Sequence, residues 1–242
     1  MDMGRAISVL SLLVCATVLA ACANKAVAPE DQQATPPQGA LSVGIVVPDG
    51  TVLNGRLFGD GNDTLVILAH MRPNDQTAWF PFAEELARNG YAALTFDFRG
   101  YGISEGDQDF DKLDDDLAAA VDYMEARGNE TIFLVGASMG GTTALVVAAE
   151  REVAGVVSIS APSEFQGHDA RDAIARITAP KLLIASENDT TARVSLEELV
   201  EADGEPLDSQ TYTGRSHGTE LFEGEHAAEV RQRILDFLDE YD

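Results

Sequence analysis

The sequence contains little cysteine, little lysine and only one long hydrophobic run. Its 242 residues include two cysteines, Cys15 and Cys22, and only three of its 16 basic residues are lysines. Cys15 lies inside the hydrophobic run, so the rest of the chain has no pair of thiols for a disulfide or a thiolate metal site. The sequence also lacks metal-ligand spacings, a phosphate-binding glycine loop and a dinucleotide fingerprint. We therefore expect no metal and no cofactor.

Basic charge is scarce as well. The chain has 16 Lys and Arg against 41 Asp and Glu, a formal net charge of −25, and a sequence pI of about 4.2. So acidic a chain repels phosphate backbones, which argues against nucleic acid as a partner. An acid-rich, lysine-poor surface resembles those of proteins from salty habitats, and it also fits an ordinary solvated surface. With 45% hydrophobic and 24% charged residues, the chain can bury a globular core.

The hydrophobic run lies at the start of the chain. After Arg5, the segment AISVLSLLVCATVLA is too short for a comfortable membrane span, and it leads into LAAC, Leu19 to Cys22. This pattern resembles the bacterial lipoprotein signal, which implies cleavage before Cys22 and a lipid on its sulfur. Ala23 resembles the outer-membrane pattern. A plain secretory signal and an uncleaved anchor are the alternatives.

Three regions follow from this interpretation. Residues 1–21 are expected to be a lipoprotein signal peptide and residues 22–40 a flexible tether, because residues 23–40 hold three prolines and almost no large hydrophobic residue. Residues 41–242 are expected to form one domain. Its location would be the bacterial cell envelope, at the outer membrane or the periplasmic face, through a lipid anchor in the membrane.

From residue 41 onward, apolar β-type runs alternate with helical stretches. Continuous apolar strands separated by helices favour a mainly parallel sheet covered on both faces. We therefore expect an α/β fold with a doubly wound sheet and an antiparallel N-terminal hairpin over 41–47 and 51–59. The further strands expected are 64–70, 91–98, 131–135, 153–160, 181–186 and 207–213, and the helices are 79–90, 111–127, 139–150, 194–202 and 226–241.

One serine stands out at residues 136–140, GASMG, between the apolar run TIFLV and a predicted helix. A serine on a sharp strand-to-helix turn projects its oxygen from the top of the sheet, and flanking glycines let strand and helix pack closely. Such a turn holds the serine in a strained backbone conformation. Ser138 is therefore the candidate nucleophile; the alternative is a small residue in a tight crossover.

A serine hydroxyl needs a base, and the base needs an orienting acid. His217 lies in a loop between the last strand and the last helix, whereas His70, His168 and His226 lie at a strand end, in a polar connection and at a helix start. His217 is the candidate base, and a surface histidine is its alternative interpretation. Asp189, just past the strand at 181–186, is the candidate acid. Its alternative role is a helix N-cap, and the rival acids are Glu187 and Glu164.

These pieces together resemble the α/β-hydrolase superfamily over residues 45–240. The matching motifs are LAHMRPND, DFRGYGISEG, GASMGG, ENDTTA and SHGTELF. Their chain order, serine then acid then histidine, is the order of that family. The resemblance implies a triad of Ser138, Asp189 and His217. It also implies that Asp97 and Arg99 fix a loop rather than take part in catalysis, and that His70 is structural.

The resemblance further implies an oxyanion hole built from the backbone N–H groups of Met71 and Met139. Members of the family usually have His-Gly where this sequence has His70-Met71, so the methionine side chain must find a place. Trp79 and Phe80, with these methionines, are weak candidates for an apolar substrate pocket, and core packing is an equal alternative. The stretch 161–179 is short, which indicates a minimal lid and an open site.

The sequence therefore predicts a serine hydrolase. It would cleave carboxylic esters of small to medium substrates through an acyl-enzyme intermediate, acting on a small-molecule ester or acyl compound. A peptidase or thioesterase on the same scaffold remains open, as does a non-catalytic envelope lipoprotein that uses the fold as a binding module.

Overall fold

The computed structural model describes Met1 and residues 39–204 and 207–242. The chain divides into two units, Met1–Glu30 and Asp31–Asp242, and every helix and strand below belongs to the second. The expected signal peptide, the lipidation site Cys22 and nearly all of the expected tether lie outside the described residues. Within the part that is described, no helix is long and apolar enough to cross a bilayer.

An 8-stranded sheet with the order β1-β2-β4-β3-β5-β6-β9-β10 runs through the domain. The pairs β1–β2 and β2–β4 are antiparallel, and all the other neighbouring pairs are parallel. This confirms the predicted mainly parallel sheet with an antiparallel N-terminal hairpin. The strands are β1 (Leu41–Val46), β2 (Val52–Phe58), β3 (Thr64–Ala69), β4 (Ala92–Phe96), β5 (Thr131–Ala137), β6 (Gly155–Ile159), β9 (Lys181–Ser186) and β10 (Asp208–Tyr212).

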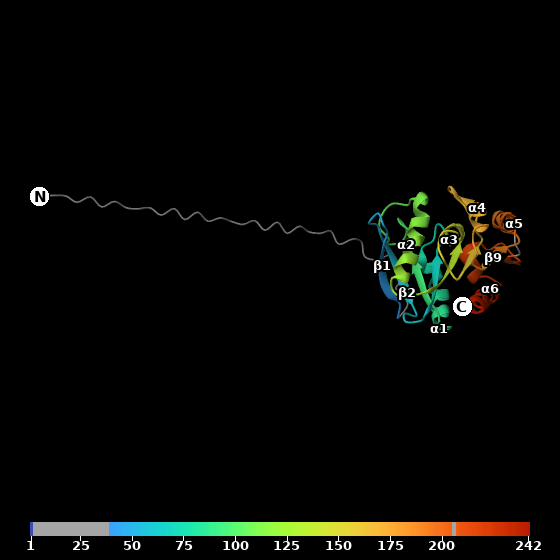
Figure 1. Ribbon diagram of the computed structural model, residues 1–242, viewed down its shortest axis with the longest axis horizontal. Helices are drawn as coiled ribbons and strands as arrows, with labels where there is room; N and C mark the ends of the chain where they lie inside the picture. The colour runs from blue at the N-terminus through green and yellow to red at the C-terminus, as the bar shows by residue number, and fades with distance from the viewer. Residues whose placement is uncertain (2–38, 205–206) are drawn as a thin grey trace. The chain divides into compact units, whose positions relative to one another are not determined.

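Helices cover both faces of this sheet. Every residue of β3, β4 and β6 is buried, which explains why these strands read as continuous apolar runs. In Figure 1, α2 and α3 lie on one side of the sheet, and α1 and α6 lie on the other. The α-helices are α1 (Phe80–Arg88), α2 (Leu113–Glu125), α3 (Met139–Ala148), α4 (Ala170–Ile174), α5 (Thr190–Asp203) and α6 (Ala227–Tyr241).

The segment expected to form a minimal lid contains more structure than the sequence indicated. A small hairpin of β7 (Glu164–Phe165) and β8 (His168–Asp169) precedes the short helix α4. Three short 3-10 helices were also not anticipated: η1 (Gln76–Trp79), η2 (Phe110–Lys112) and η3 (Gly218–Phe222). Elements of two to five residues are too short to leave a periodic pattern in the sequence.

Helix α5 begins four residues earlier than the apolar pattern predicted, at Thr190 instead of position 194. The cause is Asp189, whose side chain accepts a hydrogen bond from Ala192 N and so caps the helix. An aspartate at the N-cap satisfies a backbone N–H that has no partner inside the helix. The cap fixes the position of this aspartate at the carboxyl edge of the sheet, directly after β9.

Candidate active site

Ser138 occupies the turn between β5 and α3. Its backbone has φ 49° and ψ −115°, a conformation that residues with side chains rarely adopt. The backbone around it holds this conformation: Ser138 N donates to Ile159 O, and Ser138 O accepts from the N–H groups of Gly141 and Thr142. The strain is therefore fixed by the neighbouring strand and by the first turn of the helix.

The glycines around Ser138 are there because the backbones approach closely. A Cβ at Gly136 would overlap the carbonyl of Gly140, and a Cβ at Gly140 would overlap the carbonyl of Ala69 at the end of β3. A Cβ at Gly141 would lie 2.9 Å from Ser158 Oγ on β6. The turn that carries Ser138, which we call the elbow, thus packs tightly between two neighbouring strands, β3 and β6. This packing is the physical reason for the glycine-rich pattern, and it leaves Ser138 partly exposed.

Asp189 and His217 form a close pair. His217 Nδ1 lies 2.6 Å from Asp189 Oδ2. Because a carboxylate only accepts hydrogen bonds, this contact puts the proton on Nδ1 and leaves Nε2 as the acceptor. The His217 side chain is 38% exposed and that of Asp189 is 13% exposed. The His217 side chain is thus partly accessible, whereas its carboxylate partner is largely buried.

Asp189 has both of the roles considered from the sequence. Its Oδ1 accepts the N–H of Ala192 at 3.4 Å as a helix cap, while its Oδ2 accepts from His217. Glu187, the nearest rival, is exposed. Glu164, the more distant rival, is paired with Arg171. Of these three carboxylates, Asp189 is the one that contacts His217.

Backbone bonds join the loop that carries Asp189 to the loop that carries His217. Glu187 N donates to Tyr212 O at 2.8 Å, and Asn188 N donates to Gly214 O at 2.9 Å. Ser186 Oγ donates to Ser216 O at 2.7 Å. The end of β9 is therefore fastened to the segment just before the histidine, which pre-organises the acid and the base.

The histidine loop also packs against the elbow. A Cβ at Gly218 would lie 3.4 Å from Ala137 Cβ and 2.5 Å from Met71 Sδ. Ala137 immediately precedes Ser138, and Gly218 immediately follows His217. The structure thus brings the segments of the predicted nucleophile and base into contact. No hydrogen bond joins Ser138 Oγ to His217 Nε2 among the described residues, and in proteins without substrate this contact is often long.

The side chain of Met71 fills the space next to the histidine loop. It is buried, and Thr219 Oγ1 lies 3.7 Å from its sulfur. The methionine that replaces the usual glycine therefore supports the loop instead of narrowing a pocket. The backbone N–H groups of Met71, Arg72 and Met139 have no acceptor among the described residues. Free N–H groups are what an oxyanion hole built from Met71 and Met139 would need.

His70 is buried beneath this turn. The N–H of Phe98 donates to Nε2 at 3.1 Å, so the ring proton is on Nδ1, which donates to Met71 O at 3.0 Å. Burial lowers the pKa of His70 to about 4. Its neutral ring ties the Met71 turn to the loop after β4, in agreement with the structural role that the family resemblance implied.

The other two histidines are engaged elsewhere. His226 lies between Thr213 and Glu229, with contacts of 2.7 and 3.0 Å. His168 Nε2 lies 2.5 Å from Phe110 O, which ties the β7–β8 hairpin to η2. Neither contact involves Ser138 or Asp189. His217 is the histidine that combines an acid partner with a position beside the elbow.

Trp79 and Phe80 lie in the core. Trp79 is fully buried, and its ring packs against Phe82 and Phe222 at centroid distances of 6.3 and 5.1 Å. Phe80 is buried against Phe58 at 5.7 Å. Large aromatic rings supply much of the apolar area between α1 and the sheet. The structure supports the packing alternative for these two residues and gives no support to a pocket role.

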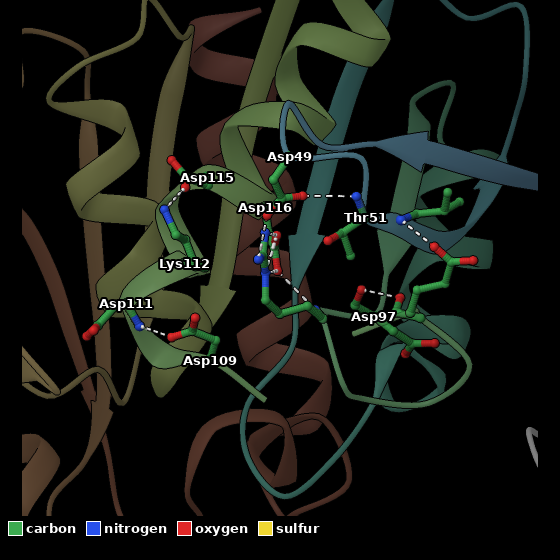
Figure 2. A network of polar contacts seen from close by, with 12 residues as sticks. Asp49, Thr51, Asp97, Asp109, Asp111, Lys112, Asp115 and Asp116 are labelled. Carbon is green, nitrogen blue, oxygen red and sulfur yellow. Dashed lines mark hydrogen bonds and ion pairs between the residues drawn. The ribbon is translucent and has the colours of Figure 1, made fainter. Parts of the chain in front are cut away.

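A buried polar network fixes the loop after β4. Arg99 donates to Asp116 on α2 at 2.6 Å and to Asp49 in the β1–β2 turn at 2.8 Å. Figure 2 shows Asp49 and Asp116 close together, with Asp49 also bound to Thr51. Asp97 accepts from Gln76 N and Nε2, both at 2.9 Å. These contacts agree with the loop-fixing role expected for Asp97 and Arg99.

Tyr101 and Arg72 were not singled out from the sequence. Tyr101 is buried, and its hydroxyl lies 3.9 Å from Met139 Sδ. Burial raises the pKa of Tyr101, and the nearby Arg72 opposes that rise. The only sequence signal for either was its place inside a motif, next to Met71 or within DFRGYG.

Among the described residues, no group of three His, Cys, Asp or Glu side chains could hold a metal ion.

Comparisons with known proteins agree with this fold. A sequence model of the α/β-hydrolase fold family matches residues 64–181. An uncharacterised Salmonella typhimurium protein is 31% identical over 118 residues, which cover 45% of this chain and 40% of that protein. Mouse serine hydrolase BPHL is 32% identical over 114 residues, 46% of this chain and 39% of BPHL. The chain thus matches about two fifths of the length of these two relatives.

Solved structures match over much more of the chain. A Pyrococcus furiosus esterase has a TM-score of 0.74 at 21% identity and covers 84% of this chain and 91% of its own. A dienelactone hydrolase from Anabaena variabilis has a TM-score of 0.71 at 25% identity, covering 86% of this chain and 99% of its own. These likenesses establish the α/β-hydrolase fold, the same fold that the matched sequence model describes.

Proposed function

We propose that this chain, which has the α/β-hydrolase fold, is a serine hydrolase that cleaves carboxylic esters of small to medium size. The proposal rests chiefly on the 2.6 Å contact between His217 Nδ1 and Asp189 Oδ2, in a loop packed against the elbow that carries Ser138. The segments that carry these three residues are far apart in the sequence and lie at one edge of the sheet. This arrangement suits nucleophilic catalysis at a carbonyl carbon.

In the first half of the reaction, Ser138 Oγ attacks the ester carbonyl while His217 Nε2 takes the hydroxyl proton. Asp189 holds the ring in the required tautomer and stabilises the imidazolium. The carbonyl oxygen becomes negatively charged, and the backbone N–H groups of Met71 and Met139 donate to it. The N–H of Met139 lies at the start of α3, where the helix dipole favours negative charge.

The first half ends when the tetrahedral intermediate expels the alcohol, which receives the proton from His217. Ser138 is then bound to the acyl group. The second half is the hydrolysis of the acyl-enzyme. Water attacks this acyl-enzyme, His217 accepts its proton, and the acid leaves as Ser138 recovers its hydroxyl proton. His217 Nε2 accepts and returns a proton in each half. Water must reach this nitrogen in the second half, and the partial exposure of the His217 side chain suits that access.

Hydrolysis of 4-nitrophenyl butyrate by wild type, Ser138→Ala and His217→Gln tests this proposal. Each variant should lose a factor of about 10³ to 10⁶ in kcat/KM because the triad acts as a unit. Ser160→Ala is a matched control, since Ser160 also has a positive φ, 51°, at the end of the neighbouring strand. It should keep its activity within about threefold. Wild-type rates in Ser138→Ala would contradict the proposal.

The short lid suggests an open site, and we therefore propose a preference for short and medium acyl chains. A series of 4-nitrophenyl esters from acetate to palmitate measures it. We expect kcat/KM to peak between two and eight carbons, an order-of-magnitude expectation for a site without a long enclosed channel. A sharp maximum at palmitate would contradict the open site.

A thioesterase on the same machinery is the second candidate. Thiohydrolase aneE of Aspergillus aculeatus is 33% identical over 121 residues, which cover 46% of this chain and 38% of that protein. The same serine attack cleaves a thioester with a thiolate as the leaving group. Comparing butyryl thiocholine with butyrylcholine, two substrates that differ in one atom, separates the two: a thioesterase should prefer the former by tenfold or more in kcat/KM.

We also propose that Cys22 carries a lipid and holds the protein at the bacterial cell envelope. The support is the sequence LAAC at residues 19–22 after a hydrophobic run. Metabolic labelling with an alkyne fatty acid in a bacterial host tests this. The full chain should be labelled and should fractionate with membranes. The Cys22→Ser variant should not be labelled and should not fractionate with membranes. Labelling that persists in Cys22→Ser would contradict the anchor.

A further inference from the structure

Most of the lysines and arginines that the structure describes make an ion pair with an Asp or Glu side chain. This is expected in a chain with 41 acidic and 16 basic residues, where carboxylates lie near almost every cation. Among the described residues, the exceptions are Arg56, Arg72, Arg88 and Arg215. An arginine that finds no acid in such a chain calls for a specific explanation.

Two of the exceptions are accounted for by local contacts. Arg56 is buried and donates to Asn54 Oδ1 and to Gly55 O inside the hairpin. Arg88 donates to Glu84 O at the end of α1, near the opposite edge of the sheet from Ser138. Arg72 and Arg215 are both exposed. Arg72 follows Met71, and Arg215 precedes His217 by two positions, so both belong to the segments that form the site.

The surroundings of Arg72 link its side chain to the elbow. Its guanidinium carbon lies 5.2 Å from the centre of the Phe110 ring. It is also close enough to Tyr101 to oppose the effect of burial on that hydroxyl, which lies 3.9 Å from Met139 Sδ. Arg72 therefore lies beside Tyr101, whose buried hydroxyl reaches the side chain of Met139, the residue that follows Ser138.

We propose that Arg72 binds a carboxylate on the substrate, so that the preferred esters are those whose acyl part ends in a negatively charged group. This inference rests on the proposed serine hydrolase activity and specifies its substrate class. A guanidinium that lies over the Phe110 ring and contacts the Tyr101 hydroxyl is already oriented, and its five N–H donors leave others for a carboxylate. With no protein acid paired to it, a substrate anion meets no competitor.

Phe110 supplies apolar surface beside the cation. Its ring is half-buried and packs edge-on against Phe165 of the β7–β8 hairpin at 5.5 Å. Phe110 borders the cation and offers apolar surface to the methylene groups next to a bound carboxylate. A hemi-ester of a linear dicarboxylic acid has these parts in order: ester, methylenes and carboxylate. The acidity of the whole chain makes a local cation necessary, because it repels anions at longer range.

A matched pair of substrates tests this specificity. The 4-nitrophenyl hemi-ester of adipic acid and 4-nitrophenyl hexanoate have acyl chains of equal length and differ in the terminal carboxylate. The measured quantity is the ratio of their kcat/KM values. We expect Arg72→Gln to lower this ratio tenfold or more, mainly through KM of the hemi-ester. Arg72→Lys should lower it less, since it keeps the charge and loses the fork.

Arg88→Gln is the matched control. It removes the same charge from another arginine without an acid partner, distant from the site, and should leave the ratio unchanged. A melting curve of each variant checks that it folds. An equal loss on both esters in Arg72→Gln, or an equal change of the ratio in Arg88→Gln, would overturn the proposal.

A binding measurement separates this inference from the proposed activity. Monomethyl adipate titrated calorimetrically into Ser138→Ala should bind, and binding should fall tenfold or more in Ser138→Ala/Arg72→Gln. This result would support the carboxylate site even if no ester were hydrolysed. A failure to hydrolyse esters would count against the hydrolase proposal alone. Hydrolysis of 4-nitrophenyl butyrate without any binding of monomethyl adipate would overturn the carboxylate site and leave the hydrolase proposal standing.

Discussion

At the residue scale, Asp189 combines a structural contact with the proposed catalytic one. One carboxylate oxygen caps α5 and the other holds His217. An asparagine can replace the cap, since it is as good an N-cap residue as aspartate. It cannot stabilise an imidazolium. The two roles can therefore be separated by choosing the substitution.

Asp189→Asn should lower kcat/KM for 4-nitrophenyl butyrate by a factor of about 10³ to 10⁴. Its free energy of unfolding should stay within about 0.5 kcal/mol of wild type, whereas Asp189→Ala should also lose about 1 kcal/mol with the cap. Chemical denaturation and ester hydrolysis measure the two effects. Glu187→Gln is the control, with an expected change below about twofold. A large loss there and none in Asp189→Asn would make Glu187 the acid.

His70 is the buried residue whose charge state matters most for the turn at Met71. Burial lowers its pKa from 6.5 to about 4. The unfolded chain therefore binds a proton between pH 6.5 and 4 that the folded protein rejects. The stability that comes from the neutral ring is complete above pH 6.5 and is lost as the pH falls towards 4.

The unfolding free energy should accordingly decrease between pH 7.5 and pH 5.5, with a contribution from His70 of about 1.4 kcal/mol. Denaturant titrations at the two pH values measure it. His70→Asn has no group that titrates, so this part of the pH dependence should disappear although the variant is less stable throughout. An identical pH dependence in both proteins would show that folding does not lower the pKa of His70.

At the scale of elements, the turn at Met71, just after β3, contacts the histidine loop at the start of η3. Gly218 has φ +55° and faces the sulfur of Met71. The loop is fastened on its other side by Glu220, whose carboxylate accepts the N–H of His217 at 3.0 Å. A change at Gly218 should therefore move His217.

Gly218→Ala should lower kcat/KM for 4-nitrophenyl butyrate at least tenfold, because the new methyl group meets Met71 Sδ. Gly214→Ala is the matched control: Gly214 also has a positive φ, +101°, but has open space around it. Adding Met71→Ala to Gly218→Ala should restore part of the lost activity by making room. If Gly214→Ala and Gly218→Ala lose activity equally, backbone strain explains the effect and the Met71 contact does not.

The sequence predicted the sheet and the elbow because both leave a local signal. Apolar runs marked β3, β5 and β6, and the glycines around Ser138 marked a turn where backbones touch. The β7–β8 hairpin and η3 gave no such signal, since each has too few residues for a period. The orientation of Met71 towards Gly218 and the stacking of Arg72 on Phe110 depend on which segments meet in the fold. These contacts could not be derived from local sequence.

At the scale of the whole molecule, the dominant property is its charge of −25. Self-repulsion at this charge opposes the compact state, and salt screens it with a Debye length of about 10 Å at 0.1 M. The ion pairs on the surface are mostly exposed and contribute little stability that salt could remove. Screening should therefore stabilise the protein.

The melting temperature should rise by several degrees, on the order of 5 °C, between 0.05 and 1 M sodium chloride. Differential scanning calorimetry measures the shift. An uncharged osmolyte at equal osmolarity is the control and should reproduce only a minor part of it. A melting temperature that is constant or falls with salt would mean that specific ion pairs outweigh the repulsion.

The central claim is that Ser138, activated by His217 and Asp189, is a nucleophile. Reaction of the folded protein with a fluorophosphonate, followed by peptide mapping in a mass spectrometer, tests it most directly. One covalent adduct should form on the peptide that contains Ser138, and Ser138→Ala should form none. A folded wild-type protein that stays unlabelled, or that carries the adduct on another residue, would contradict the account.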